Sequence, residues 1–257
     1  MKRRRIRIHS RNLGIDTEVR AFIGGGIPVL AFPTQDGMSN QWEDFGMIGT
    51  LAPWIDTGRI SVFCVDTVDI RSWSNRHARK DFRSALQEKY FHYITEEVVP
   101  AVREAAGNPS AMPLATGCSM GGAHAALCLL RRPDLFGGVL GLSGAYDARY
   151  FTGGYMDPAW AANSGVDVVL TLPEQDAKLL RQRTIALCCG RGPGEETEID
   201  ATMKLEAGLR ERKIDAWVDW WGTDVSHDWP WWKAQLSYFL PYVLEEMETN
   251  KSNGTIK

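Results

Sequence analysis

The stretch LATGCSMGGAHAA, residues 114–126, decides which fold this sequence predicts. Its first five residues are apolar or small and predict a buried strand, and the small residues after Gly121 predict a helix. Between the two, Gly117-Cys118-Ser119-Met120-Gly121 is a G-x-S-x-G motif, whose glycines leave room for a sharp turn that lifts the serine hydroxyl above a sheet. Ser119 is therefore a candidate nucleophile. The N–H of Met120 is a candidate oxyanion donor, because a helix N-terminus favours negative charge.

Buried strands alternate with helical segments on both sides of this motif. The predicted strands, read from short apolar runs, are Ile15–Ile23, Ile27–Phe32, Ile60–Val65, Leu114–Cys118, Gly138–Leu142, Thr184–Cys189 and Ala216–Trp221. The predicted helices, read from apolar residues at helical spacing, are Phe82–Ala105, Gly121–Arg131, Glu174–Arg181, Ile199–Arg212 and Trp231–Met247. This alternation indicates an α/β fold with a mostly parallel central sheet and helices on both faces.

Length and composition are those of a globular enzyme-sized domain. The 257 residues are 44% hydrophobic and 24% charged, with a net charge of -3, so the basic surface typical of nucleic-acid-binding proteins is not expected. No Pro/Ser-rich linker or internal repeat divides the chain. We expect one domain over residues 1–248, followed by a polar, frayed tail over 249–257.

The basic N-terminus is the one concentrated charge in the sequence. Its cations alternate with Ile6 and Ile8, which indicates the solvated face of a first strand rather than a nucleic-acid or membrane patch; they are Lys2, Arg3, Arg4, Arg5 and Arg7. No apolar signal-type region follows, and no run reaches the roughly 18 apolar residues of a membrane span. The expectation is a cytoplasmic protein without a nucleic-acid or membrane partner.

The cysteines indicate reduced, buried thiols. The sequence has an odd number of cysteines, and their spacing is typical of neither disulfides nor a metal site. They are Cys64, Cys118, Cys128, Cys188 and Cys189. Cys118 adjoins Ser119, but the turn geometry of the motif favours the serine as nucleophile. Neither a metal nor a cofactor is expected.

A serine nucleophile needs a base, and His227 is the candidate. Among the five histidines only His227 follows the strand Thr184–Cys189, in the order nucleophile, acid, histidine. It lies in WWGTDVSHDW, residues 220–229, whose tryptophans could wall a dry pocket around it. His124 is expected to pack against a neighbouring element instead.

The acid is expected in the loop CCGRGPGEETE, residues 188–198. Glu195 is our choice, because it ends the glycine-rich loop before the next helix begins. Glu196 is the close competitor, whereas Glu198 suits the helix N-terminus. Asp224 and Asp228 flank His227 and more simply bond backbone N–H groups of their own turn.

A second oxyanion donor is expected after the strand Ile27–Phe32. The loop reads Pro33-Thr34-Gln35-Asp36-Gly37. Pro33 has no N–H. The backbone N–H of Gln35, or failing that of Thr34, is the candidate.

The chain resembles the esterases related to esterase D, the feruloyl esterases and the mycolyltransferases. The matching pieces are VLAFPTQDG (29–37), DTVDIRSWSN (66–75), GCSMGG (117–122), LSGAYD (142–147), CGRG (189–192) and WGTDVSHDWPWWKAQL (221–236). They are spread over most of the chain, from residue 29 to residue 236, in the order of that family.

This resemblance implies an α/β-hydrolase fold and hydrolysis of carboxylic esters without a cofactor. The implied triad is Ser119, a carboxylate near Glu195, and His227. Gly194 departs from the family, whose members often have an aromatic residue before the acid. Asp69, Ser72 and Trp73 would line the acyl side or serve the fold.

The segment between Leu142 and Thr184 is too short for a large lid domain and implies an open cleft rimmed by aromatic side chains. These are Tyr146, Tyr150, Phe151, Tyr155 and Trp160. An aromatic rim suits a small-molecule ester, and it is equally typical of internal packing or of a homodimer contact.

The favoured interpretation is a serine esterase that forms an acyl-enzyme on Ser119. An acyltransferase would use the same three residues. A catalytically silent α/β-hydrolase scaffold that binds a ligand or a protein is the alternative from another class, and such scaffolds typically lack a triad residue, whereas all three are present here.

Overall fold

The computed structural model describes residues 1–252, whose centre is a sheet of eight strands. The strands are β1 (Lys2–Ser10), β2 (Ile15–Ile23), β3 (Ile27–Phe32), β4 (Ile60–Val65), β5 (Leu114–Cys118), β6 (Gly138–Leu142), β7 (Thr184–Cys189) and β8 (Trp217–Trp220). Their order across the sheet is β1-β2-β4-β3-β5-β6-β7-β8. The pairs β1–β2 and β2–β4 are antiparallel, and every pair from β4 to β8 is parallel. The mostly parallel sheet predicted from the alternating pattern is confirmed.

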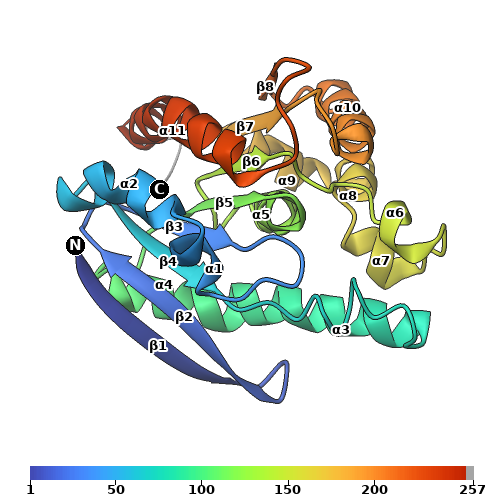
Figure 1. Ribbon diagram of the computed structural model, residues 1–257, viewed down its shortest axis with the longest axis horizontal. Helices are drawn as coiled ribbons and strands as arrows, with labels where there is room; N and C mark the ends of the chain where they lie inside the picture. The colour runs from blue at the N-terminus through green and yellow to red at the C-terminus, as the bar shows by residue number, and fades with distance from the viewer. Residues whose placement is uncertain (253–257) are drawn as a thin grey trace.

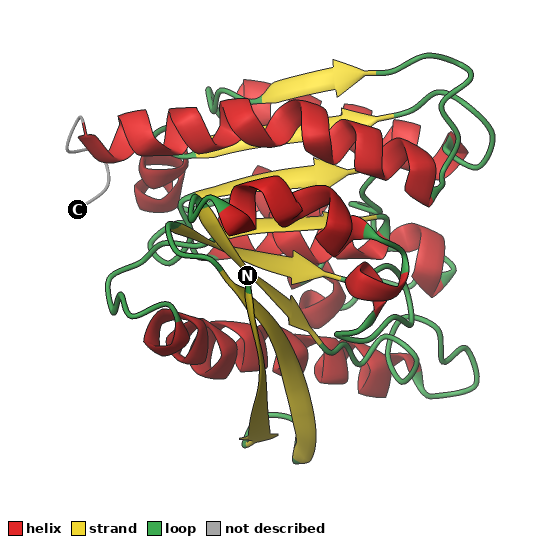
Figure 2. Ribbon diagram, turned by 60° about the vertical axis from the view of Figure 1, so that its left-hand side comes forward, coloured by secondary structure: helices red, strands yellow, loops and turns green. Residues whose placement is uncertain are grey.

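Helices cover both faces of the sheet (Figures 1 and 2). They are α1 (Gln41–Asp44), α2 (Met47–Asp56), α3 (Lys80–Tyr93), η1 (Ile94–Val98), α4 (Val99–Ala105), α5 (Met120–Arg131), α6 (Arg149–Thr152), α7 (Pro158–Ala162), α8 (Gly165–Thr171), α9 (Glu174–Leu180), α10 (Glu196–Glu211) and α11 (Trp229–Ser252). Val62 of β4 belongs to the buried cluster that includes α2 and α11, whereas its neighbour Phe63 belongs to the cluster that includes α3 and α5. Successive residues of a strand point to opposite faces, so each strand supplies both layers of the core.

The N-terminal hairpin carries the basic segment. β1 and β2 pair in register from Lys2 opposite Ile23 to Ser10 opposite Ile15. Residues 2–5 are exposed, whereas Ile6 and Ile8 are half-buried against the core. Arg3, Arg5 and Arg7 therefore form the solvated face opposite Ile6 and Ile8, as their alternation indicates, whereas Lys2 and Arg4 share the face of the isoleucines and are exposed because the strand extends beyond the core there.

Several helix boundaries differ from those predicted. The predicted helix Phe82–Ala105 is a continuous helical run, α3, η1 and α4, with a π-helical turn at Ile94–Val98. Helix α5 begins one residue earlier than predicted. The prediction of a frayed tail from Thr249 was wrong for 249–252, because α11 continues to Ser252 and Asn250 donates to Thr184 Oγ1 at 3.3 Å. The remainder of that tail, 253–257, lies outside the described residues.

The segment between β6 and β7 contains the four short helices α6 to α9. Within the described residues it forms no separate lid domain. All parallel strands end at the same edge of the sheet, so the loops that follow β3, β5, β6, β7 and β8 meet there. In open α/β sheets this carboxyl edge is where ligands bind.

Candidate active site

The turn between β5 and α5 holds Ser119 in a conformation that is unusual for a residue with a side chain. Its φ is 57° and its ψ is -125°. A Cβ at Gly117 would overlap the backbone of Gly121, and a Cβ at Gly121 would lie 2.5 Å from the carbonyl oxygen of Phe32. The turn is therefore possible because both positions are glycine. Ser119 is fixed in it, since its N–H donates to the carbonyl of Leu142 at 2.9 Å.

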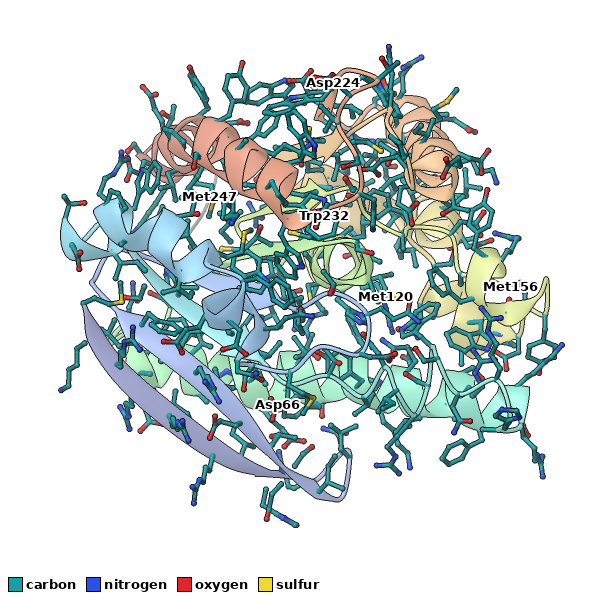
Figure 3. The ribbon with its side chains drawn as sticks, viewed as in Figure 1. Asp66, Met120, Met156, Asp224, Trp232 and Met247 are labelled. Carbon is teal, nitrogen blue, oxygen red and sulfur yellow. The ribbon has the colours of Figure 1, made fainter. Side chains whose placement is uncertain are left out.

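His227 lies beside this serine. Its Nε2 is 2.8 Å from Ser119 Oγ, although 108 positions separate the two residues in the chain. The backbone N–H of His227 donates to Pro193 O at 3.1 Å, and Trp232 packs edge-on against the ring at 4.9 Å between centroids. Met120 and Trp232, both labelled in Figure 3, approach the site from opposite faces of the sheet.

Glu195 completes a chain of three hydrogen-bonded side chains. Its Oε2 is 3.2 Å from His227 Nδ1, and the residue is fully buried. The other oxygen, Oε1, accepts a hydrogen bond of 2.6 Å from Ser143 Oγ, which in turn accepts one of 3.2 Å from Trp232 Nε1. Both carboxylate oxygens are thus held, which fixes the one that faces His227.

The other carboxylates that the sequence offers have different partners. Glu196 is exposed and accepts a bond from the N–H of Gly194 at 3.4 Å. Asp224 is exposed, and Asp228 accepts the N–H of Trp229 at 2.7 Å at the start of α11. The structure places none of them in hydrogen-bond contact with His227.

The backbone conformation explains the glycine at position 194, where the family that the chain resembles often has an aromatic residue. Its φ is +83°, a region that side chains rarely adopt, and a Cβ there would lie 3.2 Å from His227 Cβ. The glycine therefore lets the loop after β7 pass directly against the histidine.

The surroundings of His227 change its basicity. Burial opposes a charge on the ring, but the hydrogen bond and the negative charge of Glu195 outweigh it, with smaller contributions from Glu198 and Asp228. The pKa of His227 is therefore raised above its ordinary value. A raised pKa makes the neutral imidazole a better acceptor for the proton of Ser119.

Two backbone N–H groups near Ser119 are the predicted oxyanion donors. Met120 is the first residue of α5, so its N–H has no acceptor within the helix. The loop after β3 touches the same turn, because Gly121 packs against the carbonyls of Phe32 and Pro33. In that loop the N–H of Thr34 already donates to Gln41 Oε1 at 2.8 Å, so of the two predicted candidates Thr34 is the one whose N–H is occupied.

Other residues that the sequence singled out serve the core. Cys118 is fully buried, and burial, with the charge of Glu195, raises the pKa of its thiol well above the ordinary value. His124 is buried and bonds Asp69 Oδ1 through Nε2 at 3.0 Å. Ser72 and Trp73 are buried as well, so this loop does not line a substrate surface with them.

The predicted aromatic rim was wrong for two of its five members. Tyr146 and Trp160 are fully buried, because Tyr146 fills the space over Gly141 and Gly144 and Trp160 packs against Trp73. Tyr150 is exposed.

A metal ion would have to compete with these contacts. Glu195, Glu198 and His227 bring one ligand atom each within 4.8 Å of one another in the described part of the chain. His227 already offers its two ring nitrogens to Glu195 and Ser119. Coordination would therefore replace one of these hydrogen bonds.

Two residues of the site were missed by sequence reasoning. Ser143 follows β6 directly, a position that meets the carboxyl edge in any parallel sheet, so its place after the strand was an available signal. Gln41 gave no such signal, because its role depends on a helix of only four residues.

A family model described as "Putative esterase" matches residues 22–243. The chain belongs to this family. Membership makes it a carboxylic ester hydrolase and confirms the family resemblance that its motifs indicate. No curated protein matches the sequence. None of the described helices combines the length and the apolar character that crossing a membrane requires.

Solved structures share the fold at low sequence identity. A ferulic acid esterase has a TM-score of 0.74 and 16% identity, over 95% of this chain and 98% of its own. An S-formylglutathione hydrolase from Agrobacterium tumefaciens has a TM-score of 0.74 and 13% identity, over 96% and 99%. The Staphylococcus aureus fluorophosphonate-binding serine hydrolase F has a TM-score of 0.67 and 14% identity, over 95% and 98%. This member of the family therefore has the α/β-hydrolase fold.

Proposed function

We propose that this chain hydrolyses small-molecule carboxylic esters through an acyl-enzyme on Ser119. His227 is the general base, Glu195 orients and stabilises it, and the N–H groups of Met120 and Gln35 bind the oxyanion. The observation that carries the proposal is the chain of hydrogen bonds from Ser119 Oγ through His227 to Glu195, at 2.8 Å and 3.2 Å. Three separate loops contribute these residues, and the turn that presents Ser119 is strained, with a φ of 57°.

In the first half of the reaction, Ser119 Oγ attacks the ester carbonyl carbon while its proton moves to His227 Nε2. The carbonyl oxygen becomes an oxyanion, which the two N–H groups stabilise. As the tetrahedral intermediate collapses, the bond to the alcohol oxygen breaks, and His227 gives the proton to that oxygen. The acyl group then remains on Ser119 as an ester.

In the second half, water replaces the alcohol. His227 takes a proton from water as the water oxygen attacks the acyl carbon, and it returns the proton to Ser119 Oγ when the acyl bond breaks. The products are a carboxylic acid and free enzyme. Glu195 keeps Nδ1 protonated, so that Nε2 is the acceptor in both halves.

The test is hydrolysis of p-nitrophenyl esters of increasing acyl length by wild type and by Ser119→Ala. Feruloyl esters and S-formylglutathione belong in the panel, because similar folds act on them by name. Turnover by wild type that disappears in the variant supports the mechanism. Turnover that persists in Ser119→Ala would overturn the nucleophile. If wild type is inactive on all esters, labelling by a fluorophosphonate separates an acyltransferase, which reacts at Ser119, from a silent scaffold, which does not.

A further inference from the structure

The first residue of α1, Gln41, makes two hydrogen bonds to the loop that follows β3, and we call this pair of bonds the Gln41 grip. Gln41 Oε1 accepts the N–H of Thr34 at 2.8 Å, and Gln41 Nε2 donates to Thr34 Oγ1 at 2.9 Å. The next residue, Trp42, donates from Nε1 to the carbonyl of Phe32 at 2.9 Å and is buried. Two consecutive side chains therefore fix the backbone on both sides of Pro33.

The backbone at Phe32 and Pro33, which Gln41 and Trp42 hold in place, is the part of the loop that contacts the turn at Ser119. A Cβ at Gly121 would lie 2.5 Å from the carbonyl oxygen of Phe32 and would overlap that of Pro33. With no side chain between them, a shift of this backbone is a shift relative to Ser119 itself. The position of any oxyanion donor in the loop is set by the same contact.

The shape of the loop also depends on Gln41. Thr34 to Gly37 form a β-turn, in which the N–H of Gly37 donates to the carbonyl of Thr34 at 2.9 Å and Asp36 has a φ of 62°. A Cβ at Gly37 would lie 2.5 Å from Gln41 Oε1, so the glycine allows the amide to lie flat against the turn. The Thr34–Gly37 turn and the side-chain amide of Gln41 therefore determine each other's position.

These contacts determine which backbone N–H of the loop is available to a substrate. Pro33 has none, and Gln41 occupies that of Thr34. The N–H of Gln35 is then the first of the loop that can face a substrate. Ser74 also holds the exposed side chains of the turn. Its Oγ accepts a hydrogen bond from Gln35 Nε2 at 2.6 Å and donates one to Asp36 Oδ1 at 2.7 Å.

We propose that Gln41 is a positioning residue, which occupies the Thr34 N–H and thereby presents the Gln35 N–H as the second oxyanion donor. This inference rests on the proposed function, because it requires an oxyanion at Ser119. Oxyanion donors act only when they lie about 2.7–3.1 Å from the developing charge. Without the grip, the Thr34 N–H loses its acceptor, and the turn is free to rotate away from that distance.

The test compares two replacements of Gln41 that have similar volume. Gln41→Met removes both hydrogen bonds, and kcat is expected to fall about 10- to 100-fold, less than the loss of about 100- to 1,000-fold from removing a donor outright. Gln41→Glu keeps an acceptor for the Thr34 N–H, and the Thr34 hydroxyl can turn to donate to it, so most of the activity should return. In both variants KM should stay within about twofold, because the grip acts on the transition state.

Inhibition by a boronic acid distinguishes positioning of the oxyanion donor from mere support of the fold. A purely structural role of Gln41 would leave the inhibition constant unchanged. Phenylboronic acid forms a tetrahedral adduct on a serine, with a boron-bound oxygen in the place of the oxyanion. Its Ki should rise in Gln41→Met by about the factor by which kcat falls. Gln182→Met is the matched control: Gln182 is likewise partly buried but lies at the opposite edge of the sheet, before β7, and both constants should be unchanged.

The outcomes are separable from those of the proposed function. If wild type turns over esters but Gln41→Met has normal kcat and Ki, the inference is wrong while the esterase mechanism stands. If Gln41→Met does not fold, Thr34→Val decides: it removes the Oγ1 partner of Gln41 and should lower kcat about 3- to 10-fold at constant KM. An unchanged kcat in that variant would overturn the inference. Inactive wild type would instead refute the proposed function.

Discussion

Replacing Glu195 by glutamine tests the proposed site most directly. The side chain keeps its size, but one carboxylate oxygen becomes an NH2 group. Ser143 Oγ accepts from Trp232 Nε1 and donates to Glu195 Oε1, so the position of Oε1 requires an acceptor. The amide oxygen of glutamine should therefore face Ser143, and the NH2 group should face His227 Nδ1.

That orientation forces the wrong tautomer on the histidine. An NH2 group donates, so Nδ1 must accept and the ring proton moves to Nε2, which then points at Ser119 Oγ across 2.8 Å. A protonated Nε2 cannot take the serine proton. In Ser-His-Asp hydrolases the corresponding amide costs about 10,000-fold in kcat, and about 1,000- to 10,000-fold is expected here. Each tenfold corresponds to about 1.4 kcal/mol of activation free energy.

Steady-state hydrolysis of the best p-nitrophenyl ester, measured across pH, is the assay. Because Glu195 raises the pKa of His227 and burial alone lowers it, the acid limb of kcat/KM should also move to lower pH in Glu195→Gln. Glu196→Gln is the matched control one position away. Its carboxylate is exposed, and its loss should change kcat less than about twofold. A Glu195→Gln enzyme within tenfold of wild type, with an unmoved acid limb, would refute the assignment of the acid.

Three further outcomes are expected. Ser143→Ala leaves Glu195 Oε1 without its 2.6 Å donor and Trp232 Nε1 without its acceptor, so kcat should fall about 10-fold; an unchanged kcat would show that packing alone holds the acid. In wild type, kcat/KM should fall as pH drops through the raised pKa of His227, with a midpoint above about 6.5, and a midpoint below that value would contradict the geometry. Ser119→Gly and Ser119→Ala should both abolish turnover, but the glycine variant should have the higher Tm because glycine tolerates a φ of 57°; equal Tm values would mean that the turn is not strained.

Features of the structure that depend on local backbone chemistry could be predicted from the sequence. The sheet, the turn at Ser119 and the position of His227 after a late strand follow from apolar runs, two glycines and chain order. The placement of Glu195 in the loop after β7 also came from chain order, whereas its choice over Glu196 depends on which side chain faces inward. Adjacent residues at a helix start point in different directions, so one is buried and the other exposed, and no periodicity determines which.

Contacts made by side chains in irregular segments could not be predicted from the sequence. Tyr146 and Trp160 are aromatic residues in an irregular segment, which suits a rim as well as a core, and their burial depends on glycines and on Trp73 elsewhere. The grip of Gln41 on Thr34 depends on a turn that brings α1 back onto the loop before it. Neither has a sequence pattern of its own.

Backbone strain connects the parts of the site. Among the described residues other than glycine, φ is positive at Asp36, Ser119, Ser143 and Lys213. The first three each lie just beyond the end of a parallel strand, β3, β5 or β6, with φ of 62°, 57° and 47°.

Such conformations cost about 1–3 kcal/mol each and persist only where surrounding contacts impose them. Here the contacts come from the neighbouring strand: Ser119 N–H donates to Leu142 O, and Ser143 N–H donates to Cys188 O at 2.7 Å. The ends of β6 and β7 thus fix the turns at Ser119 and Ser143, so Ser119 and the serine that bonds Glu195 are both ordered by one sheet edge. A change that shifts β6 should therefore disturb both Ser119 and Glu195, even though it touches neither side chain.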